Sequence, residues 1–199
     1  MKVGVYGGTF SPPHKGHINA ASAFAKEVGL DKLLIIPTYL PPHKEYREEA
    51  TADERLSMCR IAFSGVERAE VSDMEILRGG KSYTYMTLEE LSGDGSELYL
   101  LCGTDMILTF DLWRCFERIF SLATVCYIRR ESDRESKEQI DTKVREYRER
   151  YGARILEIGN DVVEISSTEL RNLISEGKDT AEYLTPEILN FIEERGLYR

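Results

Sequence analysis

The fold is decided near the start of the chain, where residues 2–17 read KVGVYGGTFSPPHKGH. The first five of these residues form a short apolar run that predicts a β-strand, and two glycines follow it directly. Residues 15–28 then predict a helix with small alanines on one side, which ends at Gly29. A strand, a glycine loop and a helix in this order predict a phosphate site, because the first helical turn presents free N–H groups.

Strands and helices continue to alternate along the rest of the chain. Apolar runs predict strong strands at residues 32–36, 97–102 and 123–128, and weaker ones at 70–73, 154–158 and 162–165. Helices are expected at about 51–63, 82–91, 104–118 with a break near Asp111, 132–151, 167–175 and 185–195.

This alternation predicts an α/β fold. We expect a Rossmann-like, doubly wound parallel sheet with helices on both faces, in a single domain that spans residues 1–199. The C-terminal part, about residues 167–199, is predicted to be small and helical. Ligands of such sheets bind at the carboxyl ends of the strands.

Composition narrows the class of protein. The formal net charge of −9 argues against a broad surface for nucleic acid or an anionic membrane. Four cysteines without C-x-x-C spacing and only three histidines give little support to a zinc site. Cys102 and Cys126 lie in apolar runs and are interpreted as core thiols of a reduced, cytoplasmic protein. We find neither a membrane-spanning run nor a secretion signal.

The loop after the first strand has the residues that phosphate chemistry requires. Gly7 and Gly8 lack a Cβ atom, so a ligand can approach the backbone closely. His14 and His17 would share one face of a helix that begins near residue 13, and Gly16 would leave room for a nucleotide. Two imidazole donors at a helix N-terminus stabilise charge that develops on phosphorus.

A simpler interpretation is a Gly-Pro turn with two incidental histidines. Two of the three histidines fall between a buried strand and a helix, which favours the phosphate site. The G-x-G-x-x-G fingerprint is absent, which argues against a redox enzyme with a dinucleotide cofactor.

The pattern G-G-T-F-x-P-x-H-x-G-H at residues 7–17 resembles the signature of the nucleotidyltransferase superfamily, with residues 14–17 as its HxGH element. The resemblance covers nearly the whole chain and narrows to the bacterial nicotinate-nucleotide adenylyltransferases. The matching elements are Ile36-Pro37 with Pro41-Pro42-His43-Lys44, Ser82-Tyr83-Thr84, Gly103-Thr104-Asp105, Leu108-Thr109-Phe110 with Trp113, Ile165-Ser166-Ser167-Thr168 with Arg171, and Gly196-Leu197-Tyr198-Arg199. Ser11 departs from the pattern, since the family usually has Asp there.

The resemblance implies transfer of AMP from ATP to nicotinate mononucleotide, which gives deamido-NAD and pyrophosphate in NAD biosynthesis. We expect in-line attack without a covalent intermediate, and Mg²⁺ that arrives with ATP and is held mostly by phosphate oxygens and water, so no protein metal ligand is named. The implied catalytic residues are His14, His17, Lys44 and Arg171. The implied ATP-binding residues are Gly7, Gly8, Thr9, Phe10, His14, His17, Gly103, Asp105, Ile165, Ser166, Ser167 and Arg171. The implied acceptor-binding residues are His43, Lys44, Thr84, Tyr85 and Trp113.

Several of these residues also fit a purely structural interpretation. Ser166 to Thr168 could cap a helix instead of holding phosphate, with Arg171 as a surface cation. His43-Lys44 could lie in a solvated loop, and Asp105 could cap the helix that follows it. Trp113 could belong to the core, although the resemblance stacks it on the pyridine ring.

Other functions remain open at this stage. A related nucleotidyltransferase would use nicotinamide mononucleotide or phosphopantetheine as acceptor. A nucleotide-sensing protein could keep the fold without the reaction, although the HxGH element and Arg171 are both intact. The expected partners are ATP and nicotinate mononucleotide, and the sequence leaves homo-oligomerisation open.

Overall fold

The computed structural model describes residues 1–42, 49–128, 137–159, 163 and 165–199. Six strands in this part of the chain form one sheet in the order β3-β2-β1-β4-β5-β6, and all neighbouring pairs are parallel. The strands are β1 (Lys2–Gly8), β2 (Lys32–Pro37), β3 (Ala69–Val71), β4 (Glu97–Gly103), β5 (Ala123–Ile128) and β6 (Ile155–Ile158). The predicted α/β fold with a doubly wound parallel sheet is therefore confirmed.

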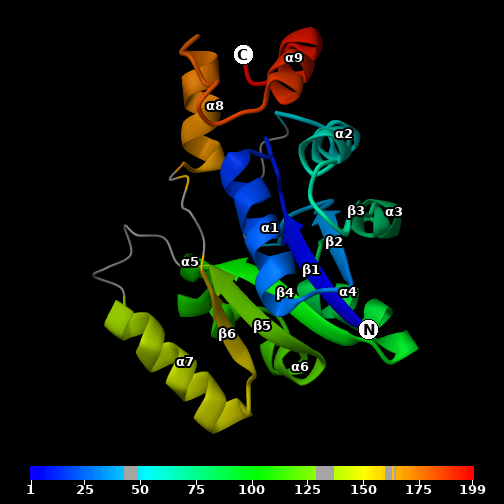
Figure 1. The fold of residues 1–199 in the computed structure, drawn as a ribbon, viewed down its shortest axis with the longest axis vertical. Helices are drawn as coiled ribbons and strands as arrows, with labels where there is room; N and C mark the ends of the chain where they lie inside the picture. The colour runs from blue at the N-terminus through cyan, green and yellow to red at the C-terminus, as the bar shows by residue number, and fades with distance from the viewer. Residues whose placement is uncertain (43–48, 129–136, 160–162, 164) are drawn as a thin grey trace.

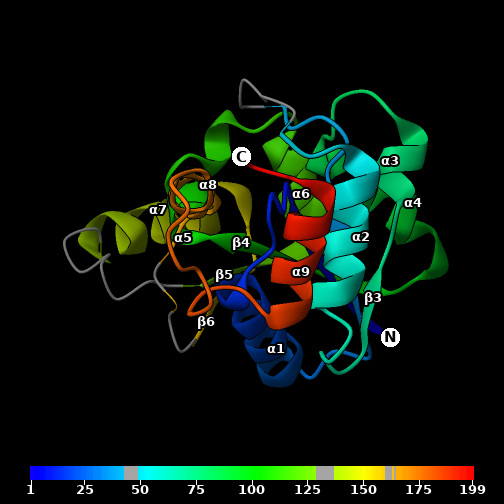
Figure 2. The same ribbon diagram turned by 90° about the horizontal axis from the view of Figure 1, so that it is seen from above.

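Helices cover both faces of the sheet (Figures 1 and 2). One face packs against α1 (Lys15–Val28), α2 (Ala52–Ala62), α8 (Ser167–Ser175) and α9 (Pro186–Arg195). The other packs against α4 (Thr84–Leu91), α5 (Thr104–Leu108), α6 (Phe116–Leu122) and α7 (Lys137–Tyr151). Side chains of β2 alternate between the two cores, since Leu33 and Ile35 join one while Leu34 and Ile36 join the other. A continuous apolar strand is what a sheet buried on both faces requires.

The connections reverse direction between β1 and β4. The chain leaves β1 through α1 on one face and leaves β4 through α5 on the other, so the loops after these neighbouring strands diverge. A doubly wound sheet binds its ligand in the crevice at this point. The C-terminal helix α9 packs against α2 (Figure 2).

The structure corrects several predicted elements. The break predicted near Asp111 within residues 104–118 is confirmed and extends to Cys115: α5 ends at Leu108, a 3₁₀ turn covers Phe110–Leu112, and α6 begins at Phe116. Cys115 interrupts the helical backbone with a φ of 55°. The short helix α3 (Met74–Arg78) has too few residues to show a helical period, and the sequence did not predict it.

Two further predictions fall partly on residues that the structure does not describe. In the predicted strand 162–165, residues 163 and 165 are described and lie outside any strand, while 162 and 164 are outside the described part. The charged helix predicted for 132–151 is described from Lys137, and only Ile140, Val144 and Tyr147 are buried along it. Among the described helices, none combines the length and the apolar composition that crossing a membrane requires.

Candidate active site

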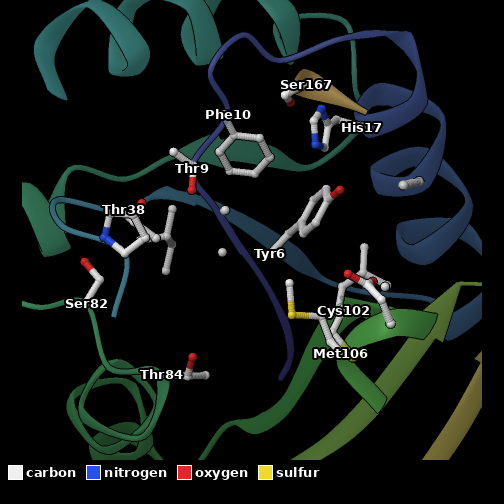
Figure 3. Close-up of a pocket in the computed structure, with 18 of the residues that line it drawn as sticks. Tyr6, Thr9, Phe10, His17, Thr38, Ser82, Thr84, Cys102, Met106 and Ser167 are labelled. Atoms are coloured by element: carbon white, nitrogen blue, oxygen red, sulfur yellow. The ribbon is translucent and has the colours of Figure 1, made fainter. Parts of the chain in front are cut away.

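A cleft of about 1040 Å³ opens at the carboxyl ends of β1 and β4, where the sheet reverses direction. Its walls come from the loop after β1, the start of α1, the end of β4, the start of α4 and the start of α8. Figure 3 shows Tyr6, Phe10 and His17 on one side of this cleft and Thr84 with Met106 on the other. Segments that are far apart in the sequence therefore meet in one hollow.

The loop at residues 9–13 is held by donors from distant parts of the chain. Three of its carbonyl oxygens accept hydrogen bonds. Thr9 O accepts from Arg55 Nη1 (3.0 Å), Ser11 O from Arg171 Nη1 (2.9 Å) and Pro12 O from Ser167 Oγ (3.2 Å). The Ser11 hydroxyl also lies 3.1 Å from the Tyr198 hydroxyl, and both residues are buried. Ser11, which departs from the family pattern, therefore joins the loop to the C-terminal segment.

The two histidines lie together at the start of α1. His14 is the N-cap residue, and its backbone N–H donates to His17 Nδ1 at 3.2 Å. Because Nδ1 accepts this bond, the neutral His17 ring carries its proton on Nε2, which can donate to a ligand. The ring centroids of the pair are 3.8 Å apart, and Phe10 packs edge-on against His17 at 5.1 Å. Both histidines line the cleft, as predicted.

Two glycines are required by these rings. A Cβ atom on Gly16 would lie 3.0 Å from two atoms of the His14 ring and 3.1 Å from the Val163 carbonyl oxygen. A Cβ on Gly8 would lie 2.9 Å from the Phe10 ring. Gly16, which was predicted to leave room for a nucleotide, lines the cleft, and its missing Cβ also accommodates the His14 ring and the Val163 carbonyl oxygen.

The start of α8 forms another wall of the cleft, lined by residues 165–168 and Arg171. Ser166 caps this helix, since its Oγ accepts from Glu169 N at 3.1 Å and the Glu169 carboxylate accepts from Ser166 N at 2.9 Å. The capping interpretation is therefore correct for the Ser166 side chain. The N–H of Glu169 is therefore satisfied, while the N–H groups that precede it in the first turn have no intrahelical acceptor and remain suited to an anion.

Arg171 lies one turn after the start of α8 and lines the cleft. Its guanidinium donates to Ser11 O, contacts Thr168 Oγ1 at 3.3 Å and pairs with Glu49 Oε2 at 2.5 Å. The cation that was predicted to hold phosphate thus has a carboxylate beside it in this structure.

The opposite wall begins at α4 and the segment after α5. Thr84 and Trp113 both line the cleft, and the Trp113 ring stacks on buried Phe110 at 4.7 Å with an interplanar angle of 14°. Tyr85 is not among the residues that line the cleft, and its side chain packs against the core instead. Only its backbone N–H, in the first turn of α4, can serve the predicted role.

Gly103 and Asp105 also line the cleft, directly after β4. The N-cap of α5 is Gly103, so the alternative in which Asp105 caps this helix is wrong. A Cβ on Gly103 would lie 2.6 Å from Asp105 Oδ1, which explains the glycine two residues before this exposed carboxylate. His43 and Lys44 lie outside the described residues.

A family model described as cytidylyltransferase-like matches residues 5–173. The chain is 37% identical to a protein of Desulfatibacillum aliphaticivorans named "Probable nicotinate-nucleotide adenylyltransferase", with 100% of both chains covered. A protein of the same name from Clostridium botulinum (strain Kyoto / Type A2) is 34% identical, with 98% of each covered. The chain belongs to the nicotinate-nucleotide adenylyltransferase family.

A solved structure of this adenylyltransferase type has the same fold. Plasmodium falciparum nicotinic acid mononucleotide adenylyltransferase complexed with NaAD aligns with a TM-score of 0.78 and 18% identity, over 99% of this chain and 97% of that one.

The structure adds cleft residues that the sequence analysis missed in this adenylyltransferase. Glu75 of α3 lines the cleft and is buried, and its Oε1 accepts from the Thr87 hydroxyl at 2.5 Å. Burial raises the pKa of the Glu75 carboxyl, and hydrogen bonds from neighbouring hydroxyls and the charge of Arg78 partly oppose this rise. Arg55 supports the loop from behind. A usable signal existed for Arg55, because it falls on the same helical stripe as Met58, Cys59 and Ala62, which are buried.

Proposed function

We propose that the chain transfers the AMP group of ATP to nicotinate mononucleotide, with release of pyrophosphate and formation of deamido-NAD. One observation carries the proposal: the histidine pair at the start of α1 and the pair Thr84 and Trp113 line the same cleft. A phosphate-binding wall and a wall suited to an aromatic ring with an acidic group therefore face each other. The names of the full-length relatives support the same reaction.

The chain's own groups act on the phosphates by position and charge. An oxygen of the mononucleotide 5′-phosphate attacks the α-phosphorus of ATP, and the bond from that phosphorus to the bridging oxygen of pyrophosphate breaks. Because this phosphate is already ionised at neutral pH, the reaction needs no general base. His17 Nε2–H and the N-termini of α1 and α8 donate to phosphate oxygens as charge develops. The proposed contacts of Lys44 and Arg171 are with the triphosphate and the leaving pyrophosphate.

Mg²⁺ belongs to this proposal as a companion of ATP. It would supply charge neutralisation at the phosphates, and it usually keeps several water ligands. Among the residues that the structure describes, there is no group of three or more His, Cys, Asp or Glu side chains that could hold a metal ion. We therefore propose phosphate oxygens and water as its ligands.

The acceptor wall favours an acid over an amide. A carboxylate only accepts hydrogen bonds, and the N–H groups of Thr84 and Tyr85 in the first turn of α4 only donate them. The NH₂ group of an amide would face at least one of these N–H groups, which would place a donor against a donor. The free face of Trp113 would stack on the pyridine ring, while Phe110 supports the other face.

The decisive assay measures pyrophosphate release from ATP with three acceptors in parallel: nicotinate mononucleotide, nicotinamide mononucleotide and phosphopantetheine. We expect release with the acid to be fastest. A preference for phosphopantetheine would overturn the proposed acceptor, and ATP binding without release for any acceptor would indicate a nucleotide sensor instead. Equal rates with acid and amide would refute the argument from the α4 N–H groups.

A further inference from the structure

A charged side chain lies fully buried behind the nucleotide-binding loop. Arg55 of α2 has 0% of its surface exposed and is among the largest fully buried side chains of the described residues. Its buried neighbours on α2 include Leu56, Met58 and Cys59, which are apolar. Arginine is rarely buried to this degree, because removing its charge from water is unfavourable unless hydrogen bonds compensate. A specific use of the guanidinium group is therefore expected.

The guanidinium group bridges two segments that border the cleft. Nη1 donates to Thr9 O at 3.0 Å, and Nη2 donates to Tyr39 O at 3.2 Å. Thr9 follows β1, and Tyr39 follows β2, so the two carbonyls belong to the loops after neighbouring strands. Thr9 and Thr38 line the cleft and lie near each other in Figure 3, whereas Arg55 does not line it. The guanidinium thus lies one layer behind the cleft wall.

These bonds determine where the neighbouring N–H groups point. In a trans peptide the C=O and N–H groups point in opposite directions. With Thr9 O turned back toward Arg55, the N–H of Phe10 points away from the buried side and toward the cleft. The same argument directs the N–H of Leu40 away from Arg55.

The backbone at Phe10 needs such support. Phe10 has a φ of 49°, in the left-handed region that a phenylalanine rarely adopts, and its ring is buried. The carbonyls on either side of it are each held by an arginine: Thr9 O by Arg55 and Ser11 O by Arg171. The two arginines therefore hold the Thr9–Phe10 peptide directly before the unusual residue and the Ser11–Pro12 peptide one residue after it.

We propose that Arg55 is a positioning residue for the phosphates of ATP. It holds the Thr9–Phe10 peptide so that the Phe10 N–H donates to a phosphate oxygen, and its buried charge favours the polyanion from behind the wall. The acceptor mononucleotide does not depend on it. This inference rests on the proposed ATP site but not on the identity of the acceptor.

The test substitutes Arg55→Lys and Arg55→Gln and uses Arg60→Gln as the control. Arg60 lies on the same helix and is exposed. ATP binding is measured by titration calorimetry without any acceptor, so that a wrong acceptor assignment cannot affect the result. Steady-state KM values for ATP and nicotinate mononucleotide are measured separately, below the unfolding temperature of each variant. Lysine keeps the charge but cannot span both carbonyls, and glutamine loses the charge.

We expect both Arg55 variants to bind ATP about tenfold more weakly or worse, as the loss of a hydrogen bond from a charged donor predicts. The KM for nicotinate mononucleotide should stay within about twofold, and Arg60→Gln should match the parent chain. Unchanged ATP binding would overturn the proposal. So would an equal rise in both KM values, or failure of both variants to fold, because either result would assign Arg55 to the stability of the core.

Discussion

Removal of the His17 ring separates its two roles in the site. His17→Ala deletes the Nε2–H donor that we propose contacts phosphate and the Nδ1 atom that accepts the His14 N–H at 3.2 Å. Loss of one donor that acts on developing charge costs about 3 kcal/mol of transition-state stabilisation. This corresponds to a fall in kcat of about a hundredfold or more.

The second role concerns stability. The bond from His14 N to Nδ1 is a local cap at the start of α1, and loss of such a cap costs about 1 kcal/mol. For a chain of this size that loss lowers the melting temperature by about 2–4 °C. His17→Ala should therefore show a small thermal effect beside a large kinetic one.

Two further substitutions separate the effect on kcat from the effect on the melting temperature. Asparagine can place its Oδ1 near the position of Nδ1, so His17→Asn should recover the melting temperature without recovering kcat. Glutamine can reach the position of Nε2 with a donor, so His17→Gln should recover part of kcat. The assay is pyrophosphate release at saturating ATP and acceptor, with thermal unfolding followed by circular dichroism. A His17→Ala variant within about threefold of the parent kcat would refute the reasoning.

Three other outcomes follow from the contacts. Glu49→Gln should lower the KM for ATP by about twofold to fivefold, because a partly exposed ion pair with Arg171 is worth up to about 1 kcal/mol; an unchanged or higher KM would contradict this. Burial raises the pKa of Glu75, so the folded chain loses stability as pH rises from the ordinary carboxyl range to the raised value. In urea unfolding, the stability of Glu75→Gln relative to that of the parent chain should therefore increase as pH rises above the ordinary carboxyl range, and a difference that stays constant with pH would contradict this. A thiol reagent at pH 8 should label the exposed Cys115 in the native protein. Burial raises the pKa of the thiols of Cys59, Cys102 and Cys126, that of Cys126 to about 12. These three thiols should therefore stay unlabelled until denaturant is added.

The parts of the fold that could be predicted are those with a local signal. Apolar runs of β-branched and aliphatic residues identify β1, β2, β4 and β5, because strands buried on both faces show no alternation. The five-residue α3 is too short to show a period. The break near Asp111 was predicted, whereas its extension to Cys115 depends on a positive φ at that residue, which the residue type does not indicate.

The site likewise has a part that could be predicted from the sequence and a part that could not. The strand, loop and helix of residues 2–17 are consecutive, so their phosphate-binding character is visible in the sequence. Arg55 and Glu75 act through contacts with Thr9 and Thr87, which only tertiary packing brings together. The ion pair of Arg171 with Glu49 likewise joins residues that no spacing rule relates.

The loop at residues 9–13 leaves the ribosome before α2 and α8, which supply the donors to its carbonyls. Until α8 has been synthesised, Ser11 O and Pro12 O lack these partners, and the β1 loop lacks the groups that fix its shape. The order of synthesis therefore places assembly of this loop after synthesis of α8. A chain truncated before residue 167 would keep the signature sequence and lose the geometry that the signature needs.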